Sequence, residues 1–163
     1  MIPERVELVL RAHGLQALEF EPGTTATAPL AAQRLGVAVG QIAKSLLFVA
    51  RDGRLFMLLC PGDRKVAASK LKAVTGSKLR MTRPDETRKA TGFEPGGVCP
   101  FGLGPEVVVL LDESLAQYPI IYPAAGTNAS GVPITFAQLV AVTGGRVGTF
   151  TAAESEAPRG RED

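Results

Sequence analysis

A single lysine, Lys44, interrupts an otherwise apolar segment at residues 42–50. It is the only charged residue between Arg34 and Arg51, and the segment around it has the composition of a buried strand. Because lysines are rarely buried without a partner, we expect Lys44 to line a cavity and to meet an anion or a carbonyl oxygen there. The alternative from the residues alone is a lysine near a strand end whose ammonium group reaches water.

The loop at residues 94–102, EPGGVCPFG, is the second segment that could do chemistry. Its glycines let the backbone approach a ligand closely with N–H groups turned inward, and its prolines restrict the loop beforehand. Such a loop suits polarising a carbonyl group or holding a phosphate. It is not a Walker loop, because no Gly-Lys-Ser/Thr sequence ends it, and a plain connector is the alternative.

Cys99 lies in this loop, but a cysteine nucleophile needs a nearby base to form its thiolate. The only histidine is His13, whose spacing from Cys99 offers no dyad, so a packing role is the better interpretation of Cys99. One histidine and two cysteines give no metal-binding signature, and we expect neither a metal nor another cofactor. Asp112 follows an apolar run and is either a functional carboxylate or the cap of a turn with Ser114.

Positive charge is concentrated in the middle of the chain. Residues 44–89 contain 12 Lys and Arg against 4 Asp and Glu, whereas the remainder contains 6 against 12. We predict a helix over residues 64–75, capped by Asp63 and ended by Gly76. Its outward basic residues form either an anion-binding face or a plain solvated surface. These residues are Arg64, Lys65, Lys70 and Lys72.

The remaining elements are predicted from hydrophobic periodicity and from the positions of Gly and Pro. Helices are expected at residues 3–13, 29–36, 82–92 and 135–144. Strands are expected at residues 42–50, 55–60, 79–81, 107–111, 120–125 and 146–150. A two-residue turn at Asp52-Gly53 joins the first two strands into a hairpin. Hairpins mixed with helices in irregular order predict an α+β fold with a mostly antiparallel sheet.

Length and composition fit one domain. The chain has 163 residues, 45% of them hydrophobic, which is enough for one core, and we place the folded part at residues 1–150. Residues 151–163 are acidic and polar and are predicted to form a disordered tail. No signal peptide and no membrane-spanning run is visible, so we expect a cytoplasmic protein with no membrane partner.

Four segments, in this order, carry a resemblance to a known family. They are GQIAKSLLF at residues 40–48, PGDRK at 61–65 with Lys70-Leu71, TGF at 91–93 leading to GGVCPFG at 96–102, and AAGT at 124–127 followed by Ile134-Thr135 and Leu139. Over about residues 4–150 the chain resembles the YbaK/ProX family. This family consists of free-standing relatives of the editing domain inserted in bacterial prolyl-tRNA synthetases.

The resemblance implies a mixed, mostly antiparallel sheet curled into a partial barrel and flanked by helices. It also implies hydrolysis of the ester that joins an amino acid to the tRNA 3′ end. The family's strand lysine falls on Lys44 and its Gly-x-x-x-Pro loop on residues 96–100, so the implied catalytic residues are Lys44, Gly96, Gly97 and Pro100. The implied substrate-binding residues are Ser45, Val98, Cys99, Phe101, Gly126 and Thr127.

Two of these positions and one nearby segment differ from common family patterns. Ser45 stands where many relatives have threonine, which keeps a hydroxyl group, and Cys99 stands where relatives often have serine or proline. The segment Asn128-Ala129-Ser130 resembles the less studied branches more than the cysteine-specific one. The expected substrate is therefore a mischarged tRNA carrying a small amino acid of unspecified identity.

The resemblance also implies partners. Mischarged tRNA is the main one, with Arg64, Lys65, Lys70 and Lys72 on its acceptor-stem phosphates, and an aminoacyl-tRNA synthetase is a further candidate. The competing interpretation is a non-catalytic module that binds a tRNA end or a nucleotide. In that case Lys44 and the glycine loop would contact the ligand without hydrolysing it.

Overall fold

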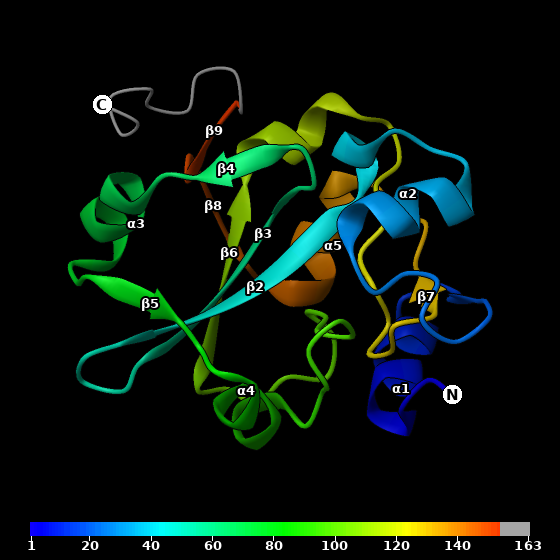
Figure 1. The fold of residues 1–163 in the computed structure, drawn as a ribbon, viewed down its shortest axis with the longest axis horizontal. Coiled ribbons are helices and arrows are strands. Elements are labelled where there is room, and N and C mark those ends of the chain that lie inside the picture. Colours follow the sequence, from blue (N-terminus) through cyan, green and yellow to red (C-terminus); the bar gives the residue numbers. More distant parts are fainter. Residues whose placement is uncertain (154–163) are drawn as a thin grey trace.

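The described part of the chain, residues 1–153, contains five α-helices and nine strands in a computed structural model (Figure 1). The α-helices are α1 (Glu4–Ala12), α2 (Ala28–Leu35), α3 (Ala68–Thr75), α4 (Pro84–Thr91) and α5 (Phe136–Thr143), with short 3-10 helices at Val39–Gln41 and Glu113–Gln117. The strands are β1 (Leu18–Glu19), β2 (Ala43–Ala50), β3 (Leu55–Pro61), β4 (Arg64–Val66), β5 (Leu79–Met81), β6 (Val107–Asp112), β7 (Ser130–Gly131), β8 (Arg146–Gly148) and β9 (Thr151–Ala153).

Five of the strands form one open sheet in the order β5-β2-β3-β6-β8. β2 pairs antiparallel with β3 and β5, whereas β6 runs parallel to both β3 and β8. The pairs β1–β7 and β4–β9 are antiparallel and lie outside this sheet. The predicted α+β class with a mixed sheet is therefore confirmed, although the central sheet is divided evenly between the two pairings. Its curling into a partial barrel stays a prediction.

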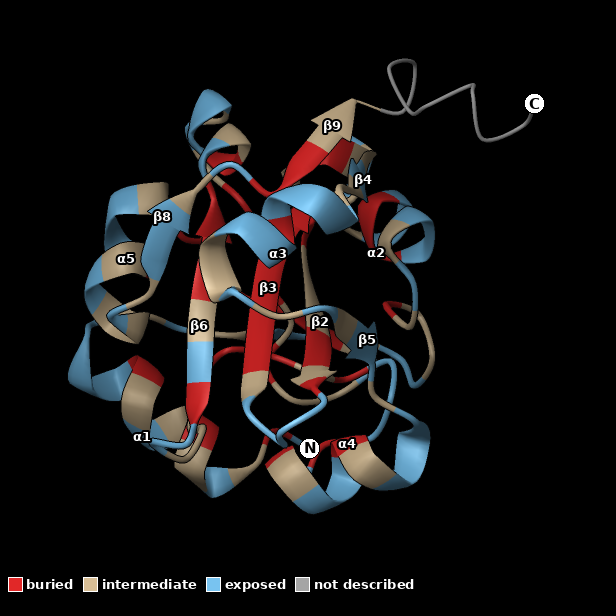
Figure 2. Cartoon of the chain, turned by 90° about the vertical axis from the view of Figure 1, so that its left-hand side faces the viewer, coloured by how far each residue is buried: buried red, intermediate tan, exposed pale blue. Residues whose placement is uncertain are grey.

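Alternating side chains bury the sheet on both faces. From β3, Met57 and Leu59 join the cluster that includes α1 and α5, while Phe56 and Leu58 join the cluster that includes Leu71 of α3. Figure 2 shows β3 buried over nearly its whole length, with α3 across one face of the sheet. A strand covered on both faces needs apolar residues at successive positions, which explains why the sequence shows an unbroken apolar run.

The hairpin between β2 and β3 has a longer turn than predicted. The N–H of Ala50 donates to the carbonyl oxygen of Arg54 at 2.9 Å, so residues 51–53 form the turn. Gly53 has φ +91°, a conformation that favours glycine and that is typical of the last residue of such a three-residue turn. The turn places Arg51 at the far end of β2 from Lys44.

The predicted helix at residues 64–75 is wrong in its first part. Residues 64–66 form β4, which pairs with β9, and α3 begins only at Ala68. The side chain of Asp63 therefore caps no helix, because the chain is still extended when it passes this residue. The four basic residues assigned to one helix face are divided between a strand and a helix.

Two other expectations differ from the structure near the C-terminal end. Residues 120–125 form only isolated bridges, Ile42 with Tyr122 and Ile121 with Ile134, rather than a strand. β9 lies beyond residue 150, where we placed the start of the tail, and Thr151 is fully buried. The rest of the predicted tail, residues 154–163, lies outside the described residues. No helix among residues 1–153 is long and apolar enough to cross a membrane.

Candidate functional site

A cavity of about 340 Å³ lies at the edge of β2, close to the start of the strand. β2 pairs with β5 only over residues 48–50, so its earlier residues have no strand neighbour on that side. The start of α2, the loop after α4 and the segment before β7 enclose this edge. Some of the lining residues could bind or act on a ligand. They are Lys44 and Ser45 of β2, Gly96 and Val98 of the loop, and the hydroxyl residues Thr25, Thr27, Thr82, Thr87 and Ser130.

Among residues 1–153, Lys44 is the only charged residue that lines the cavity. Its side chain is half-buried, and its ammonium group donates a hydrogen bond to the carbonyl oxygen of Arg64 at 3.1 Å. The prediction that Lys44 lines a cavity and meets a carbonyl oxygen is thus confirmed. An ammonium group has three protons, so two remain for a ligand. The bond to the Arg64 carbonyl oxygen restrains the ammonium group of a residue that lines the cavity.

Ser45 lies beside Lys44 and contributes an unused hydroxyl group. Its Oγ is buried and has no hydrogen-bond partner among the described residues. A buried hydroxyl without a partner costs about 1–3 kcal/mol, so such a group is uncommon unless a ligand or water completes it. Because Ser45 lines the cavity, a polar group of a bound ligand could meet this hydroxyl.

The glycine loop contributes Pro95, Gly96 and Val98 to the cavity wall, and its other residues do not line the cavity. Gly96 has φ +93°, and Gly97 and Pro100 are buried. A Cβ atom at Gly97 would lie 2.9 Å from the Cα of Thr127, so glycine is required where the loop packs on the turn at residues 126–127. The N–H of Gly97 donates to the carbonyl oxygen of Glu94 at 2.9 Å and is therefore occupied.

Gly126 and Thr127 lie under the loop rather than in the cavity wall. The side chain of Thr127 donates to Ser130 Oγ at 2.9 Å, and the N–H of Ala125 donates to the same oxygen at 3.0 Å. Thr25 Oγ1 accepts from the N–H of Ser130 at 3.0 Å and ties this turn to the segment before α2. The two residues thus support the wall through Ser130, which does line the cavity.

The hydroxyl residues of the cavity were missed by sequence reasoning. Thr82 and Thr87, at the start of α4, share a hydrogen bond of 2.7 Å, and Thr82 also donates to the carbonyl oxygen of Leu47 at 3.3 Å. Threonines are common in turns and caps, so their type alone did not distinguish them. The cluster of threonines at residues 24, 25 and 27 before a helix was the one available signal.

Cys99 and Phe101 are in the hydrophobic core and do not contact the cavity. Cys99 is fully buried, and its thiol donates to the carbonyl oxygen of Phe101 at 3.6 Å. Burial raises the pKa of the Cys99 thiol to about 12. The substrate-binding role implied for both residues is therefore corrected to support of the loop from below, and the packing interpretation of Cys99 agrees with this position.

For the hydrolytic activity that the family resemblance implies, replacing Cys99 with alanine should leave the rate within about threefold of wild type. A thiol whose pKa is raised to about 12 stays protonated throughout the neutral range, so it supplies no thiolate nucleophile. The measurement is kcat/KM for deacylation, with native-state alkylation at pH 8 as a second readout, in which Cys99 should stay unmodified. A loss of activity far beyond the loss of folded protein would restore the nucleophile hypothesis.

Two of the four basic residues predicted to contact tRNA have a structural role. Arg64 donates to Thr151 Oγ1 at 2.7 Å and to the Thr151 carbonyl oxygen at 3.2 Å, and Lys70 donates to that carbonyl oxygen at 3.2 Å. Lys65 and Lys72 are exposed and have no partner among residues 1–153. The common anion-binding helix face predicted from the sequence is therefore not present in this form.

Asp112 also has a structural role, and it does not line the cavity. The carboxyl group is buried and accepts hydrogen bonds from the N–H of Phe150 at 2.8 Å, from Thr151 Oγ1 at 3.0 Å, and from both the N–H and the hydroxyl of Ser114. The cap interpretation is correct, and the same group holds β9 in place. Within residues 1–153 no group of three or more His, Cys, Asp and Glu residues could hold a metal ion.

Comparison with known proteins connects this cavity to a family. A family profile described as "Aminoacyl-tRNA editing domain" matches residues 22–142, a range that contains every residue lining the cavity. The chain is 39% identical over 117 residues to the "Uncharacterized protein YwhH" of Bacillus subtilis, covering 72% of this chain and 74% of that protein. It is 26% identical to the "Putative Cys-tRNA(Pro)/Cys-tRNA(Cys) deacylase EbsC" of Enterococcus faecalis, covering 76% of both.

A solved structure shares the whole fold. It is described as "a putative trans-editing enzyme for prolyl tRNA synthetase" and superimposes with a TM-score of 0.83 at 37% sequence identity. The superposition covers 92% of this chain and 96% of that chain. The similarity therefore includes the strands and loops that enclose the cavity.

Proposed function

The chain belongs to the aminoacyl-tRNA editing domain family, and we propose that it hydrolyses the ester between a small, wrongly attached amino acid and the 3′ end of a tRNA. A relative described as a deacylase and a structural neighbour described as a trans-editing enzyme support aminoacyl-tRNA deacylase activity. One observation about the molecule carries the proposal. The same cavity is lined by Lys44, its one cation among residues 1–153, and by Gly96 and Val98 of the glycine loop.

Backbone amides of the loop would stabilise the negative charge that develops on the ester carbonyl. Pro100 has no N–H group and the N–H of Gly97 is occupied, so the amides of the lining residues Gly96 and Val98 are the donors that the loop would offer. Fixed donors act on the tetrahedral intermediate without reorganisation, and in a partly dry cavity their effect is stronger than in water. Lys44 would add its positive charge to the same oxygen or to the terminal phosphate and sugar.

The attacking group would be water rather than a protein side chain. Among residues 1–153 no carboxylate, imidazole or thiol lines the cavity. The titratable side chains that do line it are Lys44 and Tyr122, and we assign Lys44 to charge stabilisation rather than to proton transfer. A hydroxyl group of the terminal ribose could take the proton from water and pass it to the departing ribose oxygen. The hydroxyl oxygen and the departing oxygen are on neighbouring carbons of the ribose. The proton transfer therefore requires that Lys44 and the loop position the substrate, but it requires no further catalytic residue.

The cavity wall favours a small, uncharged amino acid. The volume of the cavity, about 340 Å³, is at the lower end of the range for ligand sites, which are typically about 300–1,000 Å³. Alanines at residues 26, 28 and 31 and aliphatic residues Leu35, Ile42 and Leu46 make most of the wall apolar. One methylene group changes binding by only about 1–3 kcal/mol, so discrimination would come mainly from excluding larger side chains.

A deacylation screen tests this proposal. Purified protein is incubated with tRNA charged with alanine, serine, threonine, cysteine or proline, and loss of the amino acid is followed over time. We expect turnover of at least one of the small amino acids and protection of a larger, correctly attached one. If every ester survives while the same tRNAs bind, the chain is a binding module and the hydrolytic proposal is wrong.

Partners and location form part of the proposal. Exposed Lys65 and Lys72 are candidates for contact with tRNA phosphates, whereas Arg64 and Lys70 would act mainly by positioning β9. An aminoacyl-tRNA synthetase that serves the same tRNA is a candidate partner, as the description of the structural neighbour suggests. A cytoplasmic location fits a substrate that is used in translation.

A further inference from the structure

A second cavity, of about 590 Å³, lies at the other end of β2. The turn after β2, the end of α3 and the start of β5 enclose it. Of the nine lining residues within the described part of the chain, four are cations and none is acidic: the cations are Arg51, Lys72, Lys78 and Arg80. All four are exposed. Positive charge at a concave surface is the arrangement that attracts a polyanion.

Three of the four cations have no acidic partner. Arg80 forms a two-pronged ion pair with Glu86, at 2.9 and 2.8 Å, so its charge is compensated. Arg51, Lys72 and Lys78 form no ion pair among residues 1–153. The charges of these three residues are therefore available to a ligand. In contrast, two of the four basic residues that the sequence suggested as a helix face, Arg64 and Lys70, are bonded to Thr151 of β9.

The end of α3 does not cancel this charge. The last carbonyl groups of a helix carry partial negative charge, which repels an anion. Here the carbonyl oxygen of Thr75 accepts from the Arg54 guanidinium at 3.4 Å, and that of Lys72 accepts from the N–H of Gly76 at 2.8 Å. These contacts leave the cavity with a net positive lining.

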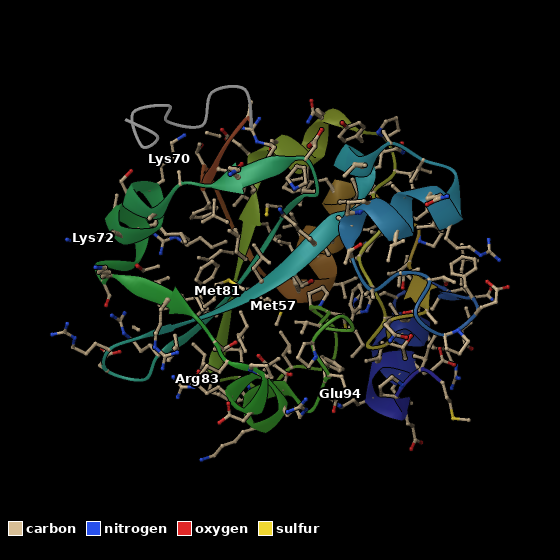
Figure 3. All side chains as sticks on the ribbon, in the orientation of Figure 1. Met57, Lys70, Lys72, Met81, Arg83 and Glu94 are labelled. Atoms are coloured by element: carbon tan, nitrogen blue, oxygen red, sulfur yellow. The ribbon has the colours of Figure 1, made fainter. Side chains whose placement is uncertain are left out.

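The two cavities share β2 and β5 as boundaries, because residues 42–47 line the first cavity and residues 49–51 line the second. Met81 of β5 lines the first cavity and its neighbour Arg80 lines the second. Figure 3 shows Met81 where β5 crosses β2, with Lys72 further out on α3. Arg51 follows Lys44 by seven residues of extended chain, which is about 23 Å at roughly 3.3 Å per residue. That length corresponds to about seven stacked nucleotides at about 3.4 Å each.

We propose that the second cavity binds the phosphate backbone of the tRNA acceptor stem while the aminoacylated 3′ end enters the first cavity. The separation exceeds the short unpaired 3′ end, so the phosphates that reach Arg51, Lys72 and Lys78 belong to the paired stem. Backbone contacts of this kind position a nucleic acid without reading its sequence. This inference rests on the proposed function, because it takes the aminoacyl ester to lie beside Lys44.

Salt-dependent binding of uncharged tRNA tests the cavity independently of catalysis. The double variant Arg51→Gln/Lys78→Gln is compared with Arg11→Gln/Arg146→Gln, which removes two exposed charges from α1 and from β8 at the opposite edge of the sheet. Each lost duplex phosphate contact lowers the slope of log K against log salt by about 0.9. The first variant should lose a slope of about 2, so the affinity ratio between 50 and 200 mM salt shrinks by about tenfold, while the control keeps the wild-type slope.

Hydrolysis of a stem-less substrate separates this inference from the proposed function. An RNA trinucleotide aminoacylated at its 3′ end should be hydrolysed by the Arg51→Gln/Lys78→Gln variant at the wild-type rate, whereas KM for full-length tRNA rises. Equal salt slopes for the two double variants would overturn the role of the cavity even if both hydrolyse tRNA. Failure of the wild type to hydrolyse either substrate would reject the proposed function and leave the slope measurement to decide the tRNA contact.

Discussion

Replacing Lys44 with methionine is expected to lower kcat/KM for deacylation by about 10²–10³-fold, the range observed when one fixed donor to a developing oxyanion is removed. Lys44 is the only charged residue lining the cavity in the part of the chain that the structure describes, and methionine keeps most of its length while removing the ammonium group. The fold should survive, because the substitution removes a single hydrogen bond to the Arg64 carbonyl oxygen, a loss of about 1 kcal/mol.

Two variants control this measurement. Lys44→Arg keeps the charge but changes its geometry, so it should recover only part of the activity. Lys89→Met removes an exposed lysine of α4 that lines neither cavity and should leave kcat/KM unchanged. Thermal unfolding of each variant separates a lost charge from a lost fold. Wild-type kcat/KM in folded Lys44→Met protein would remove Lys44 from the mechanism.

Of the substitutions proposed for this protein, Asp112→Ala should have the largest effect on stability. We expect a decrease of about 2–4 kcal/mol in the free energy of unfolding. The substitution deprives the buried N–H of Phe150 and the buried hydroxyl of Thr151 of their acceptor. A buried donor without an acceptor costs about 1–3 kcal/mol, and two are left here. Urea unfolding followed by circular dichroism gives the value.

Asp112→Asn is the matched control for this effect. The amide keeps the shape of the side chain and one acceptor oxygen, so the loss of stability should be clearly smaller than in Asp112→Ala. Glu106→Ala removes an exposed carboxyl group and should be close to neutral. If Asp112→Ala unfolds at the same urea concentration as Glu106→Ala, the hydrogen bonds at this group contribute nothing to the attachment of β9.

Local signals in the sequence were sufficient to predict most of the helices and the two strands of the central hairpin. The positions of Pro29 and Gly36 predicted α2 to within a residue or two, and the apolar runs predicted β2 and β3. In each case the determinant is local: a cap, a terminating glycine or an apolar run. Such elements can be predicted without knowing what they contact.

The error at residues 64–66 arose because the determinant is not local. These residues are extended because they pair with β9, a strand nearly ninety positions away whose own sequence, Thr-Ala-Ala, has weak strand preference. Without its partner β4 looks like the first turn of a basic amphipathic helix. Pairing between distant segments overrides local propensity, and a single sequence gives no sign of it.

The candidate site shows the same division. Lys44 was recognisable because a charge within an apolar run is conspicuous, and the loop at residues 94–102 because of its glycines and prolines. The threonines of the cavity wall were not, since threonine is unremarkable in any exposed turn. Whether Lys44, Ser45 and the loop amides act on a substrate stays a prediction that the variants above can test.

The contact between Lys44 and Arg64 links the reactive end of the cavity to the last described strand of the chain. The Arg64 carbonyl oxygen that holds the lysine belongs to β4, and β4 is kept in place by β9, which Asp112 in turn secures. Truncation of the chain after residue 150 would look harmless from composition alone, yet it would remove β9 and with it the strand pairing that holds β4 and the Arg64 carbonyl oxygen in place. Recombinant versions, fusions and tags should therefore preserve Thr151–Ala153, since their removal would displace the Lys44 ammonium group although these residues lie outside the cavity.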